Sequence, residues 1–86
     1  NVYSIGDAEA EVIEAQVMST SPIAGSRIAD IDFPEGVIVG GILKNGDMIK
    51  PNSQSKIEEG DIIALFVLSK DIPQVERLLQ VTIDYF

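Results

Sequence analysis

The fold is decided by residues 32–61, which read DFPEGVIVGGILKNGDMIKPNSQSKIEEGD. Turn signals interrupt this stretch at residues 34–36, 45–46 and 59–61, and apolar segments lie between and after them. The pair Asn45-Gly46 is especially informative, because both residues tolerate the positive φ that a two-residue hairpin turn requires. The stretch therefore predicts short strands joined by tight turns, with a hairpin at Asn45-Gly46.

The apolar segments within and directly after this stretch predict three strands. Residues 37–43 are apolar throughout, which is typical of a central strand covered on both faces. Within it, Gly40-Gly41 indicate a close backbone approach by a neighbour or a ligand. The strand after the hairpin turn ends at Pro51, which lacks a ladder donor, so an edge position is expected. Residues 62–68 predict another buried strand.

The segments outside this stretch add a strand and two helices. Residues 11–18 alternate, which predicts a half-buried strand with Ile13 and Val17 on its apolar face. A short helix is expected to begin after Gly25, with Ser26 as its N-cap. Asp71 is expected to cap a second helix over residues 72–80, with Gln74 as its reciprocal partner. The buried stripe of this helix is predicted to contain Ile72, Val75, Leu78 and Leu79.

The predicted fold class is α+β, a small βαβββα lobe with a mixed sheet, a hairpin and a C-terminal helix. The domain is expected to span residues 11–80, with residues 1–10 as a linker and residues 81–86 as a tail. The chain begins without Met, so we expect it to be a piece of a longer protein.

The composition excludes several classes of function. The 86 residues contain no Cys and no His, so disulfides, thiolate metal sites and the commonest general base are absent. The net charge of −8 disfavours nucleic acid and anionic lipid. The apolar run at residues 62–68 is too short to span a bilayer, so no direct membrane insertion is expected. The serines have no His to activate them and the glycines do not form a phosphate cradle, so we expect no enzyme.

Two sets of residues have more than one interpretation. The acidic residues near the N-terminus and at residues 58–61 are interpreted as solvated surface rather than a cation site. An apolar set lies around the short helix, and it is either monomer core or shared with a second copy across a two-fold axis. Its members are Ile23, Ile28, Ile31, Phe33, Val37 and Val39.

Several short motifs, taken in order, resemble the TrkA C-terminal domain, the C-lobe of the RCK modules that regulate potassium channels and transporters. These motifs lie at residues 21–25, 31–37, 51–52, 59–61 and 75–78. The closing helix and the aromatic tail Tyr85-Phe86 resemble the end of bacterial Trk-type potassium-uptake regulators. The resemblance covers residues 11–80 and implies the last domain of such a regulator.

The resemblance implies a lobe that dimerises and follows a Rossmann lobe, which would bind NAD or ATP and which this chain lacks. No cofactor is therefore expected in this chain. Some members of the family bind cyclic di-AMP in a groove between two C-lobes. The candidate dimer or ligand groove here contains Arg27, Ile28, Ile31, Phe33, Pro34, Val37, Ile38 and Pro51.

The charge around this groove argues against a dianionic ligand. Asp30, Asp32 and Glu35 lie where a dianion would need donors, and Arg27 is the one nearby cation. We therefore expect cyclic di-AMP to bind weakly or not at all.

The resulting functional hypothesis is a non-catalytic regulatory and dimerisation domain of a Trk-type potassium-uptake system. It would act on a membrane potassium transporter subunit through the longer protein, in the cytoplasm at the inner face of the plasma membrane. The alternative is a ligand-sensing lobe attached to another cation or anion transporter or antiporter.

Overall fold

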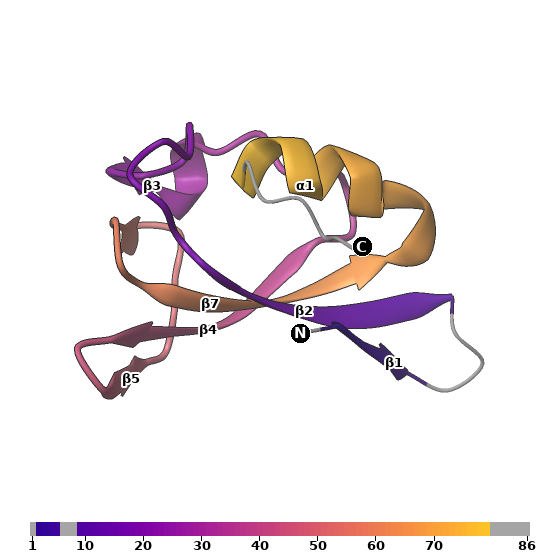
Figure 1. Ribbon diagram of the computed structural model, residues 1–86, viewed down its shortest axis with the longest axis horizontal. Helices are drawn as coiled ribbons and strands as arrows, with labels where there is room; N and C mark the ends of the chain where they lie inside the picture. The colour runs from indigo at the N-terminus through magenta and orange to yellow at the C-terminus, as the bar shows by residue number, and fades with distance from the viewer. Residues whose placement is uncertain (1, 6–8, 80–86) are drawn as a thin grey trace.

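A five-stranded antiparallel sheet organises the molecule (Figure 1). The computed structural model describes residues 2–5 and 9–79. The strand order is β1-β2-β7-β4-β5, and every described pairing in the sheet is antiparallel. The α+β class is confirmed, whereas the predicted mixed sheet is wrong. The sheet strands are β1 (Val2–Ile5), β2 (Ala10–Gln16), β4 (Ile38–Lys44), β5 (Asp47–Ile49) and β7 (Ile62–Leu68).

The remaining elements lie on one side of the sheet (Figure 1). A two-stranded ribbon pairs β3 (Ser26–Arg27) with β6 (Lys56–Ile57). It is followed along the chain by the 3-10 helix η1 (Ile28–Asp30), and a second 3-10 helix, η2 (Ser69–Asp71), leads into α1 (Ile72–Leu79). Within the described part of the chain, no helix is long and apolar enough to cross a membrane.

The hairpin forms where the sequence predicts it. Asn45 has a φ of 50° and Gly46 a φ of 86°, and Lys44 pairs with Asp47 directly across the turn. Positive φ at both central residues is the signature of a type I′ turn. Strand β5 then occupies the edge of the sheet and ends at Ile49, two residues before Pro51. The hairpin and the edge position are both confirmed.

The core lies between the sheet and α1. Ile13 on β2, Ile42 on β4 and the alternate residues Ile63, Leu65 and Val67 on β7 are buried. From the helix, Val75 and Leu79 are buried against them, and Ile72 and Leu78 pack at the edge of this core. The predicted apolar stripe of the helix and the apolar face of β2 are thus confirmed.

The opposite side of the sheet carries no described element, so the prediction that β4 is covered on both faces is wrong (Figure 1). We call this side the outer face. Strand register and alternation of burial on β2, β4, β5 and β7 place nine apolar side chains on it. They are Ala10, Val12, Ile38, Leu43, Met48, Ile62, Ala64, Phe66 and Leu68.

A bulge in β4 explains the glycine pair. The pairing with β7 shifts register between Val39 and Gly41. A Cβ at Gly40 would lie 2.6 Å from Cε2 of Phe66, and one at Gly41 would lie 3.0 Å from Sδ of Met48. The close approach predicted from Gly40-Gly41 is therefore made by neighbouring side chains of the same sheet.

Three local predictions are corrected by the structure. Residues 2–5, expected within a linker, form β1 and pair with β2. Ser26 does not cap a helix, because Gly25 N donates to Ile57 O at 2.7 Å and Ser26 pairs with Ile57 in β3. The following turn is only a 3-10 helix, preceded by Arg27 without a side-chain cap.

At the second helix, η2 runs directly into α1, so the helical backbone begins before Asp71. The carboxylate of Asp71 contacts Lys70 Nζ at 3.1 Å. The predicted capping box with Gln74 is therefore not the start of this helix. Residue 80 of the predicted helix and the tail at residues 81–86 lie outside the described residues.

Candidate functional site

An open hollow of about 150 Å³ lies beside η1, between the loop that follows it and β4. Its lining is mostly apolar and contains no titratable side chain among the residues that form it. Four of the eight predicted groove residues line it, namely Ile28, Phe33, Val37 and Pro51. Val39 and Asn52 complete the lining, and we call this hollow the groove.

The two additional lining residues follow from patterns in the sequence. Val37 and Val39 are two positions apart in an extended segment, so both face the groove. Asn52 directly follows Pro51 in the turn before β6. Alternation along residues 37–39 would have predicted Val39, and it would also have separated Ile38 from the groove.

The other four predicted residues do not line the groove. Ile31 is half-buried and packs against the core, and Pro34 is half-buried in the following loop. Ile38 points to the outer face and is 62% exposed. Arg27 is exposed on the ribbon, where it binds neighbouring polar side chains.

The turn at residues 52–55 is held against η1 by its own hydrogen bonds. Gln54 N donates to Asn52 Oδ1 at 2.8 Å, which is the geometry of an Asx turn. Ile28 N then donates to Ser55 O at 2.9 Å, and Ala29 N donates to Ser53 O at 2.8 Å. These bonds fix the polar end of the groove relative to its apolar wall.

Charges of both signs surround the groove. Arg27 Nε lies 3.0 Å from Asp30 Oδ2, so this cation is already paired. Arg27 is not the one nearby cation that the sequence predicts, because β3–β6 pairing also places Lys56 directly opposite it. Asp32 and Glu35 are exposed on the loop after η1. The groove is therefore an apolar surface, and the charged residues around it carry no large excess of positive charge.

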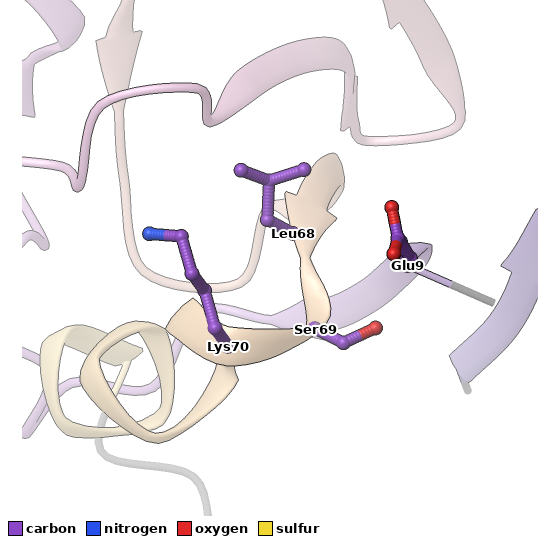
Figure 2. Close-up of a pocket in the computed structure, with 4 residues that line it drawn as sticks. All are labelled: Glu9, Leu68, Ser69 and Lys70. Atoms are coloured by element: carbon purple, nitrogen blue, oxygen red, sulfur yellow. The ribbon is translucent and has the colours of Figure 1, made fainter.

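A second hollow, of about 370 Å³, lies at the end of β7 and was not predicted from the sequence. Glu9, Leu68, Ser69 and Lys70 line it, and Leu68 lies between Lys70 and Glu9 in the view of Figure 2. Ser69 N donates to Glu9 O at 2.9 Å, which joins its two sides. The Lys70 side chain is 74% exposed and contacts Asp71.

A cluster of ion pairs fastens β4 to the turn before β7. Lys44 Nζ lies 2.5 Å from Asp61 Oδ2 and 3.3 Å from Glu58 Oε1. Burial lowers the pKa of Lys44, but the hydrogen bonds and charges of Asp61 and Glu58 outweigh it, so this pKa is raised above 10.5. We call these three residues the Lys44 cluster. Its side chains bind one another, which is a structural rather than a catalytic arrangement.

The described residues contain no group of three or more acidic side chains placed to hold a metal ion. The acidic residues at 58–61 lie at a turn whose backbone is closed by Asp61 itself, because Glu58 N donates to Asp61 Oδ2 at 2.8 Å. The Asp61 carboxylate therefore stabilises the turn.

The comparison with protein families gives one match across most of the chain. The family described as the TrkA-C domain aligns with residues 12–80. This range contains the groove, the Lys44 cluster and all of the described elements except β1 and the first part of β2.

Curated relatives align over nearly the whole chain. A Trk system potassium uptake protein TrkA from Azorhizobium caulinodans is 35% identical over 99% of this chain and 19% of its own length. Its counterpart from Halomonas elongata is 36% identical over 100% of this chain and 20% of its own length. The chain therefore spans about a fifth of the length of these relatives.

Solved structures share the fold. An RCK domain superposes with a TM-score of 0.69 at 16% identity, covering 79% of this chain and 96% of that one. An RCK_C domain dimer of S. agalactiae BusR, solved in complex with c-di-AMP, superposes with a TM-score of 0.68 at 25% identity. That superposition covers 83% of this chain and 97% of the other. The family match, the relatives and the shared fold together show that this chain belongs to the TrkA-C domain family.

Proposed function

We propose that this chain is a non-catalytic regulatory domain of a potassium-uptake system. In this proposal the domain self-associates and passes the ligand state of a longer protein to a membrane transporter, at the cytoplasmic face of the membrane. The observation that carries the proposal is the alignment of almost the entire chain with one-fifth of proteins named for potassium uptake.

The chemistry of the described side chains supports a non-catalytic role. The sequence contains no His and no Cys, and the groove is lined by apolar side chains and one amide. The most buried ionic group, the Lys44 cluster, is fully occupied by contacts within itself and with its turn. A regulatory lobe needs surfaces that respond to a partner or a ligand rather than a reactive centre.

Self-association is supported by the structural neighbour from S. agalactiae BusR, which is described as a dimer. In the part of the chain that the structure describes, the sheet is covered on one side only, and association would add buried apolar surface to a domain of this small size. We propose that the partner in this association is a second copy of this chain.

The second candidate is a ligand-sensing lobe attached to a transporter or antiporter of another kind. The observation that favours it is the same neighbour, because that RCK_C domain is in complex with c-di-AMP. The sequence that precedes this chain in its longer protein discriminates the two candidates. A strand followed by G-x-G-x-x-G and a distant acidic residue would favour the Trk-type regulator.

The proposal is tested by potassium uptake in cells that lack their own uptake system. The longer protein is expressed with its transporter, either intact or with residues 12–80 replaced by a flexible linker. We expect the replacement to abolish regulated uptake while the transporter remains in the membrane at its normal level. The matched control is Gln74→Lys, an exposed position on α1 that should leave uptake unchanged. Normal uptake after the replacement would refute a regulatory role for this domain.

A further inference from the structure

We infer that the outer face of the sheet is a docking surface for an amphipathic helix from another part of the longer protein. The inference rests on the proposed function, because a regulatory domain needs contact with the rest of its protein to pass a signal on. Four side chains of the outer face are prominently exposed: Met48 is 69% exposed, Ile38 62%, Phe66 41% and Leu68 36%. A contiguous exposed apolar patch of this kind marks an interaction site.

The register of the strands makes the apolar side chains of this face continuous. Phe66 on β7 pairs with Val12 on β2 and with Ile38 on β4, which forms one apolar row across three strands. A second row, nearer the hairpin, contains Ile62, Leu43 and Met48. In packed domains, an apolar sheet face of this kind is covered by another layer of secondary structure.

The size of the face favours a partner from the same protein. Three of its strands have seven residues and β5 has three. At about 4.8 Å between strands and about 3.4 Å per residue, the projected area is roughly 400 Å², so both partners together bury roughly 800 Å². Interfaces between separate proteins that bind stably bury about 1,200–2,000 Å², whereas contacts between domains of one chain bury about 600–1,500 Å². The face therefore fits a contact within one protein.

The connection to the longer protein supplies the missing affinity. This chain spans about a fifth of the length of its curated relatives, so most of such a protein lies outside it. Whatever precedes this chain joins it just before β1, which is an edge strand of the same sheet. A short connection of this kind gives an effective concentration in the millimolar range, which allows a small apolar face to remain occupied.

The shape of the face matches a single helix. Seven residues of a strand extend about 24 Å, the length of about 16 helical residues, and the three long strands together are about 14 Å wide. A helix with its side chains is about 10–12 Å in diameter, so one helix lying along the strands covers the centre of the face. On the other side of the same sheet, α1 already packs as such a layer (Figure 1).

Charge defines the chemistry of this helix further. On β2, β4 and β7, which the structure describes in full, Glu14 is the one ionisable residue at an outward position, so docking desolvates few charges. The chain as a whole carries a net charge of −8. A helix with Lys or Arg beside its apolar stripe is therefore attracted to this face, whereas a second copy of the chain would add a further −8.

The first test measures how fast a thiol on the outer face reacts. The chain contains no Cys, so Ile38→Cys and Met48→Cys each place a single thiol on the face, and both positions are mostly exposed. Glu59→Cys, on the exposed turn before β7, is the matched control. Each variant is made in the 86-residue chain and in the longer protein. Circular dichroism checks folding, and peptide mapping quantifies a maleimide label at the substituted position.

We expect labelling at positions 38 and 48 to be slower in the longer protein by about tenfold or more, as for a face that is free in about a tenth of the molecules. Labelling at position 59 should be equally fast in both proteins. Equal rates at positions 38 and 48 in the two proteins would overturn the inference and leave the proposed regulation and self-association intact. Equal slowing at position 59 would also overturn it. Protection that grows with the concentration of the isolated chain would overturn it as well, because a second copy would then cover the face.

Photo-crosslinking identifies what covers the face. Benzoylphenylalanine replaces Ile38 in the longer protein, the transporter is present, and mass spectrometry identifies the crosslinked peptide. We expect a peptide of the longer protein from outside residues 1–86, with apolar residues at helical spacing and Lys or Arg beside them. A crosslink to the transporter, or to residues 1–86 of a second copy, would overturn the inference.

Discussion

The Nζ atom of Lys44 lies 2.5 Å from Oδ2 of Asp61, and this contact joins the end of β4 to the turn before β7. The same carboxylate accepts a hydrogen bond from Glu58 N, and the backbone oxygen of Asp61 accepts one from Val17 N at 2.8 Å. Asp61 therefore holds three segments that are distant in sequence. Its side chain is only 9% exposed, so loss of these partners leaves polar groups in a poorly hydrated place.

We expect Asp61→Ala to lower the free energy of unfolding by about 2–3 kcal/mol, because it leaves the Glu58 amide without its acceptor and removes the closer of the two carboxylates that bind the Lys44 ammonium. Asp61→Asn is the matched control, since an amide oxygen can still accept from Glu58 N, and it should lose about half as much. Urea denaturation followed by circular dichroism measures both. Equal stability of Asp61→Ala and the wild type would show that the cluster contributes nothing net.

The Lys44 cluster also predicts a dependence on pH. Burial opposes the charge of Lys44, but Asp61 and Glu58 raise its pKa above 10.5 in the folded state. A raised pKa of a base adds stability that is fully present below the unfolded value and is lost as pH rises through the folded value. The stability difference between the wild type and Lys44→Met should therefore be constant from pH 7 to about 9.5 and shrink above about 10.5. A difference that grows above that pH would contradict the assigned shift.

The hairpin turn provides a test of backbone strain alone. A Cβ at Gly46 would meet nothing within 4 Å, so a substitution there acts through its φ of 86° rather than through crowding. We expect Gly46→Val to destabilise the fold by about 1–3 kcal/mol, because a β-branched residue resists positive φ. Gly46→Asn should cost less, because asparagine tolerates this conformation. An unchanged urea midpoint for Gly46→Val would rule out the type I′ geometry.

Gly40 tests crowding instead. A Cβ there would lie 2.6 Å from the Phe66 ring, so Gly40→Ala should destabilise by about 1–2 kcal/mol through overpacking. In a Phe66→Leu background the same substitution should cost at least about 0.5 kcal/mol less, because the ring is gone. A double-mutant cycle by urea denaturation gives this coupling. Additive effects would mean that the backbone, not the ring, resists the methyl group.

The ligand prediction concerns nucleotides. We expect this chain to bind neither NAD nor ATP, because no glycine-rich turn opens α1, where a pyrophosphate would need amides. For cyclic di-AMP we expect weak or no binding, since Arg27 is already paired with Asp30, although Lys56 lies opposite. Isothermal calorimetry checks each ligand. A dissociation constant for cyclic di-AMP near or below about 1 μM would contradict the expectation.

Local chemistry made much of the fold predictable. Asn45-Gly46 specifies its turn through backbone conformation alone, and the alternation around Ile13 and the stripe of Val75 and Leu79 specify which sides face the core. These signals lie within a few residues of the structure they determine. They identified the hairpin, the strand at residues 62–68 and the C-terminal helix.

The errors arose where distant pairing decides the conformation. Ser26 satisfies the local rule for an N-cap, but pairing with Ile57 draws it into an extended ribbon. The apolar run of β4 is typical of a strand that is covered on both faces. Only the three-dimensional arrangement shows that Ile38 is left exposed. Lys44 and Asp61 are 17 positions apart, so no local sequence pattern near either residue predicts their contact. Of the groove, the sequence predicted half of the residues on its list correctly and missed Val39 and Asn52. Arg27, Ile31 and Pro34 lie elsewhere, and Ile38 is displaced from the groove wall by one step of alternation.

That one step of alternation has a mechanical consequence. Val37 and Val39 line the groove, while Ile38 between them points to the outer face. The bulge at Gly40 follows immediately, which gives this short segment a register that differs from the rest of β4. A molecule seated in the groove would press on Val37 and Val39, and Ile38 between them would carry that displacement to the outer face. Whatever contacts Ile38 there and a molecule in the groove would therefore affect one another equally, because such linkage is reciprocal.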